Sequence, residues 1–249
     1  MIKLSDGAMK FKQLRGGFKE MMNDFCIDVY SGAQPSSSSQ SAANLAPTGV
    51  KLMRFTKDGA AWSPSVAQKD TVTITSATEG QTQIVTVNGV AYTYLNGAGE
   101  SLTTVALAVA KMLNALPEVA AISAVGVVHV QSRYPGVAYT IAVSGTGSPS
   151  TAVITANSVG SGLHFGTLTA NVLSKDAANW QGTGIANGVA GWWRMKGSFT
   201  DDDSLSTVFV RMDGACNTAN SDLLALTTLN IVVGGIDNVT SFSVTQPQS

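Results

Sequence analysis

The segment from residue 70 to residue 157 has the pattern of a complete small domain placed inside a longer β-rich chain. Within it, Val72 and Ile74 alternate with threonines, and two further alternating runs flank the Asn88-Gly89 pair. Asn-Gly between two such runs favours a tight β-hairpin, because both residues tolerate positive φ. A chain of 249 residues could form one large β domain or two ordinary ones, and the insertion favours two.

A helix is predicted after this hairpin. Ser101 can cap its first turn and Pro117 ends it. The apolar residues between them fall three and four positions apart, as on one face of a helix: Leu102, Val105, Ala106, Val109, Met112, Leu113 and Leu116. Two strands are expected at 126–131 and 138–143, and a further run at 152–155 could close the sheet. The segment is therefore expected to be an α+β domain of ββαββ order, with its helix on a sheet.

The two flanks, residues 25–69 and 158–249, are expected to form one discontinuous outer domain. Alternating or β-rich runs predict strands at 25–30, 52–56, 188–196, 207–212, 229–233 and 239–245. Several short polar or glycine-rich breaks separate these runs, which favours a β-sandwich or an open barrel. The fold class expected for the whole chain is mainly β, interrupted by the inserted ββαββ domain.

Residues 1–24 are expected to form either an N-terminal arm or a helix that caps the outer domain. Its apolar residues follow helical spacing apart from a Gly-Gly pair that weakens a helix: Phe11, Leu14, Phe18, Met21 and Met22. As an arm, the segment would dock on a neighbouring subunit with its basic and aromatic residues. Phe11, Leu14 and Phe18 are therefore interface candidates.

Trp192 and Trp193 are the other interface candidates. Adjacent residues of a strand face opposite sides of a sheet, so one indole is expected in the core. The other must be exposed, covered by a loop, or buried by a partner, and aromatic anchors are common at interfaces. An exposed indole could also stack on a sugar ring, which keeps a surface glycan as an alternative partner.

Charged residues make up only 12% of the chain, about half of the usual share. A surface of this kind relies on hydroxyls, amides and backbone, which suits extended contact with protein neighbours. Lys and Arg number 15 against 16 Asp and Glu, and the resulting net charge of −1 disfavours general nucleic-acid binding. No apolar run approaches the roughly 20 residues of a membrane span, and the beginning lacks a signal-peptide pattern, so folding in a cytoplasm is expected.

No group of residues predicts a catalytic, metal or cofactor site. His129 and His164 lack neighbouring ligands in the sequence, whereas an ordinary metal site needs three or four. The run Asp201-Asp202-Asp203 lacks the EF-hand pattern and is expected to form a solvated turn. In Gly182–Gly188 the third glycine is displaced from its position in a nucleotide-binding loop, and a flexible loop is expected instead.

Two possibilities stay open in the outer domain. Cys26 and Cys216 could become neighbours, although free, buried thiols are favoured because two cysteines do not make a disulfide framework. Carboxylates such as Asp213 and Asp222 could meet in space, as glycoside hydrolysis would require. No Gly-x-Ser-x-Gly motif is present, and a non-catalytic protein is expected.

Several segments of the flanks together resemble a known family. They are Met9-Lys-Phe-Lys12, Ile27-Asp-Val-Tyr-Ser-Gly-Ala-Gln-Pro35, Ala190-Gly-Trp-Trp-Arg194, Asp213-Gly214, Asn220-Ser-Asp-Leu223 and Ser241-Phe-Ser-Val-Thr245. The family consists of tailed-bacteriophage virion proteins that are often described only as structural. The resemblance covers roughly residues 9–63 and 180–247 and includes no chemical signature. The insert is similar to a small module that recurs inside phage tail, sheath and fibre proteins, and typical family members are shorter, with a brief connection in its place.

The resemblance implies a non-catalytic structural component of a tailed-phage virion, synthesised and assembled in the cytoplasm of the bacterial host. Its partners would be other virion proteins and further copies of itself, for which closed rings or lattices are the natural assemblies. Within the particle, the resemblance favours the head–neck region, as a collar or capsid accessory protein. The alternative function is a surface glycan-binding β module, with an exposed tryptophan as its sugar platform.

Overall fold

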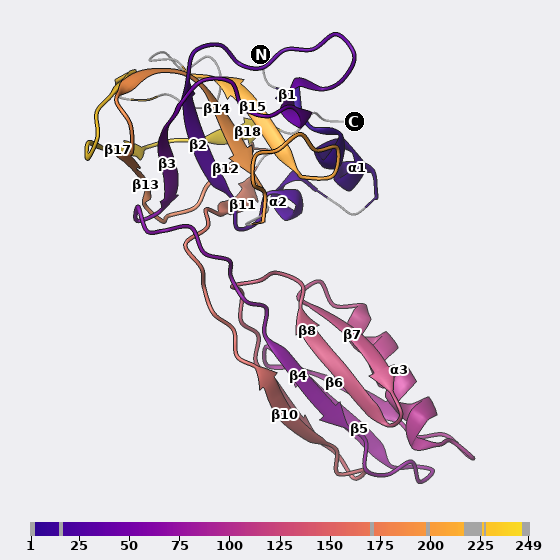
Figure 1. Cartoon of the computed structure of the whole chain (residues 1–249). Coiled ribbons are helices and arrows are strands. Elements are labelled where there is room, and N and C mark those ends of the chain that lie inside the picture. Colours follow the sequence, from indigo (N-terminus) through magenta and orange to yellow (C-terminus); the bar gives the residue numbers. More distant parts are fainter. Residues whose placement is uncertain are drawn as a thin grey trace. The chain divides into compact units, whose positions relative to one another are not determined.

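The computed structural model describes residues 3–14, 17–169, 172–197, 200–216, 226 and 228–245. The chain divides into an outer unit, residues 1–64 and 160–249, and an inserted unit, residues 65–159 (Figure 1). The sequence predicted the insert at 70–157, slightly inside the limits of this unit. Strands make up most of the regular structure in both units, which confirms the predicted fold class.

The outer unit is a sandwich of two antiparallel sheets. In the described ranges the large sheet has the order β1 (Lys3–Leu4), β15 (Arg211–Ala215), β14 (Gly188–Lys196), β2 (Cys26–Ser31), β3 (Lys51–Lys57), β13 (Trp180–Gly184) and β17 (Ile236–Val239), and β16 (Asn230–Ile231) pairs with β14. The small sheet consists of β11 (Phe165–Thr169), β12 (Val172–Lys175) and β18 (Ser243–Thr245). Apolar side chains from both sheets share one core. The large sheet is open, since its path ends at β1 and β17.

Alternation along the central strands divides their side chains between the two faces of the large sheet. Ile27, Val29 and Phe55 belong to the apolar core. Asp28 lies between Ile27 and Val29, Arg54 directly precedes Phe55, and the two charged residues are paired across β2 and β3. Their side chains therefore emerge on the opposite face, because neighbours in a strand point to opposite sides.

The N-terminal helices contribute side chains to the apolar core of the outer unit. They are α1 (Asp6–Leu14) and α2 (Phe18–Met21), and a 3-10 turn, η1 (Ala42–Asn44), lies later in the chain. Phe18 is buried, and its ring centroid lies 5.5 Å from that of Phe165. Phe18 thus packs in the core of its own unit, as expected for the capping-helix alternative, and its role at an interface stays a prediction. The side chains of Phe11 and Leu14 lie outside the described part of the chain.

Two segments of the outer unit differ from expectation. The first half of Gly182–Gly188 is not a flexible loop, because Gly182 and Gly184 belong to β13, between β3 and β17. A Cβ on Gly182 would lie 2.7 Å from the Met53 side chain, so the glycine permits close packing within the sheet. The strand predicted at 207–212 begins only at Arg211, and the residues before it form bends.

The inserted unit contains two sheets and a helix, α3 (Leu102–Asn114). One sheet has the order β10 (Ser150–Thr155), β4 (Lys69–Thr73), β8 (Val127–Ser132) and β7 (Val119–Ala124). The other has the order β6 (Val90–Leu95), β5 (Thr82–Val87) and β9 (Ile141–Ser144). The expectation of a single sheet is wrong, because the β5–β6 hairpin pairs with β9 and not with β4.

The local signals of the insert are confirmed. Asn88 and Gly89 both have positive φ, 49° and 81°, at the turn between β5 and β6. Ser101 and Thr104 form a capping box at the start of α3, and the apolar face of α3 packs mainly on β7 and β8. None of the helices in the described ranges has the length and apolar character needed to cross a bilayer.

The chain enters and leaves the insert through two neighbouring segments. On the outer-unit side, Ser63 and Ser161 exchange hydrogen bonds, including Ser63 N–H to the Ser161 hydroxyl at 2.8 Å. On the inserted side, Val66 and Ser158 form an antiparallel bridge, with N–O distances of 2.9 and 3.3 Å. In each unit, hydrogen bonds therefore hold the entering and the leaving segment together at the junction.

Candidate functional site

A layer of charged side chains lies on the face of the large sheet that is opposite the apolar core. We call it the charged layer; its residues are Asp28, Lys51, Arg54, Arg194, Lys196, Asp201, Asp203, Arg211 and Asp213. Most of them are buried. Removing charges from water is unfavourable unless they are paired and hydrogen-bonded, so their pairing decides whether this face is stable.

Two arginines of the charged layer each form two hydrogen bonds to one aspartate, and Arg194 Nη1 also lies 3.9 Å from Asp203 Oδ1. Arg194 donates from Nε and Nη2 to the two carboxylate oxygens of Asp213, at 2.8 Å each. Arg211 donates from Nε and Nη2 to Asp201, at 2.7 and 2.5 Å. The planar guanidinium matches the two oxygens of a carboxylate, so both pairs are locally neutral.

The centre of the charged layer holds three cations around two carboxylates. Arg54 donates from Nε and Nη2 to Asp28, at 2.6 and 2.8 Å. The Nζ atoms of Lys51 and Lys196 lie 2.9 and 3.2 Å from Asp28 Oδ2. The same two atoms lie 3.2 and 2.9 Å from Asp203 Oδ2. Among these five described residues, positive charge exceeds negative charge by one.

The Asp201–Asp203 segment is not the solvated turn that its sequence suggested. Asp201 is buried against Arg211, and Asp203 accepts a hydrogen bond from the Tyr30 hydroxyl at 3.1 Å. Asp202 remains exposed. Two of the three carboxylates thus neutralise cations of the sheet, which holds this loop over the charged layer.

Aromatic rings cover parts of the charged layer. The Arg54 guanidinium lies 5.3 Å from the Trp62 ring centroid, and Lys196 Nζ lies 5.8 Å from it. The Tyr30 and Trp192 rings are stacked with their centroids 4.5 Å apart. Cations over aromatic faces are attracted by the ring quadrupole, more strongly where water is excluded.

Trp192 and Trp193 are both fully buried. Trp193 packs in the apolar core, as expected for one member of the pair. Trp192 lies on the opposite face and donates from Nε1 to the Thr48 carbonyl at 3.2 Å. A loop therefore covers the outward indole. Of the three alternatives for the outward indole, cover by a loop is the one that the structure shows, and neither ring is accessible as an interface anchor or as a sugar platform.

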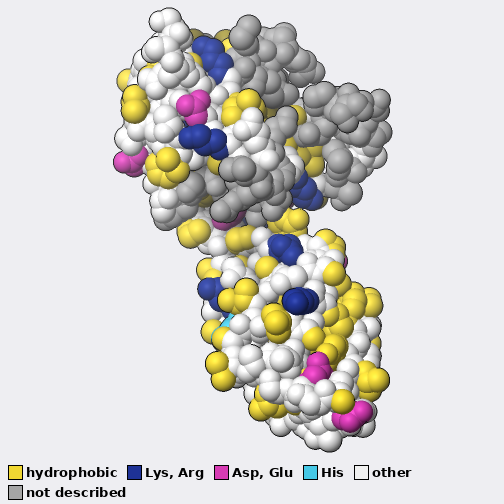
Figure 2. Space-filling model, turned by 90° about the vertical axis from the view of Figure 1, so that its right-hand side faces the viewer, with side chains coloured by type: hydrophobic (Ala, Val, Ile, Leu, Met, Phe, Trp, Pro, Cys, Tyr) yellow, Lys and Arg dark blue, Asp and Glu magenta, His cyan; other side chains and the backbone are white. Residues whose placement is uncertain are grey.

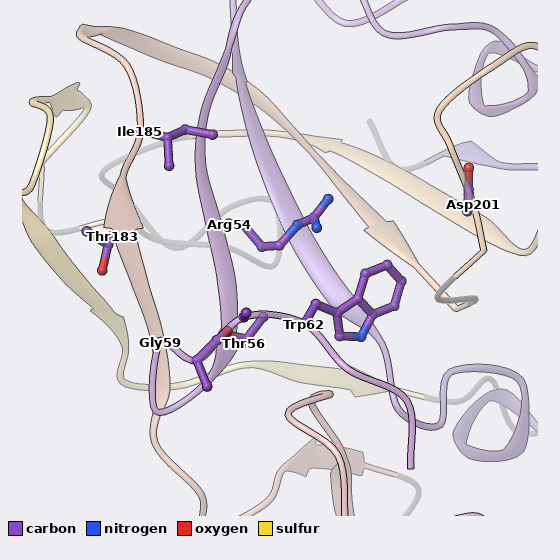
Figure 3. Close-up of a pocket in the computed structure, with 9 residues that line it drawn as sticks. Arg54, Thr56, Gly59, Trp62, Thr183, Ile185 and Asp201 are labelled. Carbon is purple, nitrogen blue, oxygen red and sulfur yellow. The ribbon is translucent and has the colours of Figure 1, made fainter. Parts of the chain in front are cut away.

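A cleft of about 520 Å³ opens beside the charged layer (Figure 3). Its lining residues are Arg54, Thr56, Gly59, Ala60, Ala61, Trp62, Thr183, Ile185 and Asp201. In Figure 3, Arg54 extends from β3 toward the Trp62 side of the cleft, while Thr183 and Ile185 lie on the other side. The cleft thus combines one partly exposed guanidinium with hydroxyl and apolar walls.

The charged layer keeps its central acid and base ionised at neutral pH. Burial by itself would raise the pKa of Asp28, but the Arg54 hydrogen bonds and the charges of Lys196 and Lys51 outweigh it and lower the pKa to about 2. The hydrogen bond to Asp28 in turn raises the pKa of Arg54. Neither group of this pair can exchange a proton near pH 7, so the pair is suited to holding charge and not to acid–base catalysis.

We expect Asp28 to make the outer unit sensitive to acid. A carboxylate with a lowered pKa in the folded state stabilises the fold above its unfolded pKa, and this contribution disappears as the pH falls toward the folded pKa. For a drop from about 3.8 to about 2, the contribution is about 2 kcal/mol. Asp203 also stabilises the fold more at neutral than at acid pH, because the charge of Lys196 lowers its pKa despite burial. Asp213 has the opposite effect, because burial raises its pKa.

Urea unfolding followed by tryptophan fluorescence at pH values between about 6 and 2 measures this effect. The free energy of unfolding should fall mainly below about pH 4. A constant value down to pH 2 would contradict the role assigned to Asp28.

The remaining candidate ligands are dispersed. His129 is exposed on β8 of the inserted unit, whereas His164 lies in the outer unit with Nδ1 2.9 Å from Asn23 Oδ1. Burial lowers the pKa of His164. Within the described ranges, no group of three or more His, Cys, Asp or Glu is arranged to hold a metal ion.

The two possibilities left open in the outer domain have different outcomes. Cys26 and Cys216 are free thiols, and burial raises the pKa of both, that of Cys216 to about 12. Asp222 lies outside the described residues, so the structure does not test whether it meets Asp213. Asp213 itself is bound by Arg194.

The sequence does contain a signal for the charged layer. Asp28, Arg54, Arg194 and Asp213 each stand between large apolar residues or next to them in a strand. Alternation of this kind normally indicates a solvated sheet face, and the loops that cover this one carry no pattern that reveals their position. Comparison of the chain with protein-family models finds no matching family, and comparison with curated proteins finds no matching sequence.

Proposed function

We propose that the protein is a non-catalytic structural component of a tailed-phage virion, which docks through its outer unit and carries the inserted unit as an added module. The observation that carries this proposal is the nested organisation, in which residues 65–159 form a second core inside the chain of the first. The resemblance of the flanks to phage virion proteins, and of the insert to modules of phage tail, sheath and fibre proteins, supports the choice of particle. The same resemblance favours the head–neck region, as a collar or capsid accessory protein.

The character of the surface supports a role in protein contacts. Figure 2 shows hydrophobic side chains spread over one face, with few Lys, Arg, Asp and Glu side chains between them. In the whole chain, charged residues reach only 12%. Larger exposed apolar areas on soluble proteins mark interaction sites.

One part of the outer unit is the best candidate for docking. Five aliphatic residues there are each more than half exposed: Ile185, Val189, Val232, Val233 and Ile236. We call them the apolar edge group. Their two segments are joined by hydrogen bonds, including Gly184 N–H to the Gly235 carbonyl at 2.8 Å. Ile236 belongs to β17, the last strand on the described path of the large sheet, and an edge strand can pair with a strand of another protein.

Quantitative mass spectrometry of purified particles tests the virion role. The particles are those of the phage whose genome encodes this chain, with the capsid and portal proteins as internal standards for copy number. We expect the chain in fixed stoichiometry to the portal protein. A level no higher than that of contaminating host cytoplasmic proteins would contradict the proposal.

Immunogold labelling of the same particles separates the role from the location. Label at the junction of head and tail is the expected result. Label confined to the tail tube or fibres would retain the virion role and contradict the head–neck location.

A further inference from the structure

The excess positive charge of the charged layer reaches the cleft at one residue. Of the three central cations, Lys196 has a side chain only 2% exposed, whereas those of Lys51 and Arg54 are 28% and 31% exposed. Arg54 lines the cleft, and Lys51 does not. Water and an incoming ligand can therefore reach the excess charge through the Arg54 guanidinium.

Arg54 has binding capacity on the edge of the guanidinium that faces away from Asp28. Its two hydrogen bonds to Asp28 use Nε and Nη2. Nη1 carries two further N–H donors. Asp28 also neutralises parts of the Lys51 and Lys196 charges, so it cannot balance Arg54 alone.

The surroundings of Arg54 limit what can bind. Trp62, Ala61 and Ile185 give the cleft apolar walls, and Thr56 and Thr183 add hydroxyls. The carboxylate of Asp201 is occupied by Arg211, so it does not cancel the charge of Arg54. A nucleic acid presents a row of phosphates and needs several cations, whereas this cleft presents one.

We propose that the cleft binds the carboxylate of one Asp or Glu side chain, carried on a partly apolar segment of a partner protein. Arg54 donates to this carboxylate from Nη1, and the added negative charge balances the centre of the charged layer. The apolar neighbours of the carboxylate contact Trp62 and Ile185, and the apolar edge group extends this contact beyond the cleft. The site follows from charge complementarity and stands whether or not the partner is a virion protein.

Thr183 provides a variant that adds a negative charge to the wall of the cleft. It is exposed, and it lies directly opposite Arg54 in the pairing of β13 with β3. Side chains in such cross-strand pairs have Cβ atoms about 5 Å apart. The Arg54 guanidinium extends from there to Asp28 on β2, so Thr183→Asp adds a negative charge to the cleft without replacing Asp28 as the partner of Arg54. Thr183→Asn is the matched control, because it has nearly the same shape and no charge. Neither change touches the buried pairs.

The probes are two blocked tripeptides, Val-Glu-Val and Val-Gln-Val, titrated into the full chain. Heteronuclear NMR follows the Arg54 Nε–H and Trp62 indole signals. We expect the Glu peptide to bind about tenfold more tightly than the Gln peptide, as for a hydrogen bond to a charged group. Thr183→Asp should weaken binding of the Glu peptide about tenfold, because the added carboxylate repels that of the peptide, and Thr183→Asn should not weaken it.

Three results with the peptides would overturn the proposal. They are equal binding of the two peptides, unchanged binding of the Glu peptide by the Thr183→Asp protein, and the absence of any shift at Arg54 at millimolar peptide. A single-stranded oligonucleotide that shifts the Arg54 signal more strongly than the Glu peptide would identify phosphate as the ligand and would also overturn it.

Discussion

Replacing Asp28 with asparagine is expected to destabilise the outer unit by about 3–5 kcal/mol. The two side chains have nearly the same shape, so the substitution removes charge and leaves packing unchanged. Arg54, Lys51 and Lys196 would then share Asp203 as their carboxylate in the centre of the charged layer. Leaving buried charges without a counter-ion is among the largest effects that a single substitution produces.

The tryptophans make this measurement specific to one unit. All 4 tryptophans, Trp62, Trp180, Trp192 and Trp193, belong to the outer unit, so their fluorescence during urea unfolding reports on that unit. Asp202→Asn is the matched control, because Asp202 is exposed in the same loop as Asp203. Its effect should stay within about 0.5 kcal/mol. If Asp28→Asn lowered the free energy of unfolding no more than Asp202→Asn, the charged layer would add no stability.

Leu113→Ala is expected to destabilise the inserted unit by about 2–5 kcal/mol and to leave the outer unit unchanged. Leu113 is fully buried on α3 and belongs to the core of the insert, which shares no residue with the core of the outer unit. Truncating it removes buried apolar contacts and leaves a cavity. The effect should therefore be confined to residues 65–159.

Hydrogen exchange measured by mass spectrometry resolves the two units in one experiment. Exchange should accelerate in the strands of the insert and stay constant in β2, β3 and β14. Leu107→Ala is the control on the same helix, since Leu107 is 45% exposed and loses little burial on truncation. If tryptophan fluorescence showed the same loss of stability for Leu113→Ala, the two units would unfold as one.

The parts of the fold that sequence predicted well depend on short stretches of chain. The turn at Asn88-Gly89 and the helix that begins after Ser101 are each determined by residues a few positions apart. The choice of strand partners is different, because it joins residues far apart in the sequence. Nothing local shows that β4 pairs with β8 and β10, or that β5 pairs with β9.

Several strands were not predicted, and in two of them, β7 and β13, the composition hides the strand. β7, Val-Ala-Ala-Ile-Ser-Ala, is rich in alanine, which has weak strand propensity, and it is held by pairing with β8. β13 contains two glycines, which suggest a loop in isolation. In the folded chain these glycines allow Met53 and the Val232 carbonyl to approach closely. Packing at a distance therefore overrides the local signal in both strands.

The candidate site was harder to predict than the fold. The charged residues of β2, β3, β14 and β15 were visible in the sequence, but alternation alone assigns such residues to water. Burial of Asp28 and Arg194 depends on loops at residues 42–48, 60–63 and 200–206, whose positions are set by the finished sheet. The cleft beside Arg54 exists only once β3, β13 and the loop that carries Trp62 have come together.

The junction at Ser63–Val66 and Ser158–Ser161 has an evolutionary consequence. Hydrogen bonds within each unit join the entering and the leaving segment at this junction. Gain, loss or exchange of the inserted unit would therefore change only one loop of the outer unit. Joining ends that are already adjacent adds little loop-closure entropy, so such exchanges should be well tolerated. We therefore expect recombination at this position, so that related genomes encode different inserted domains between the same two flanks of the outer unit.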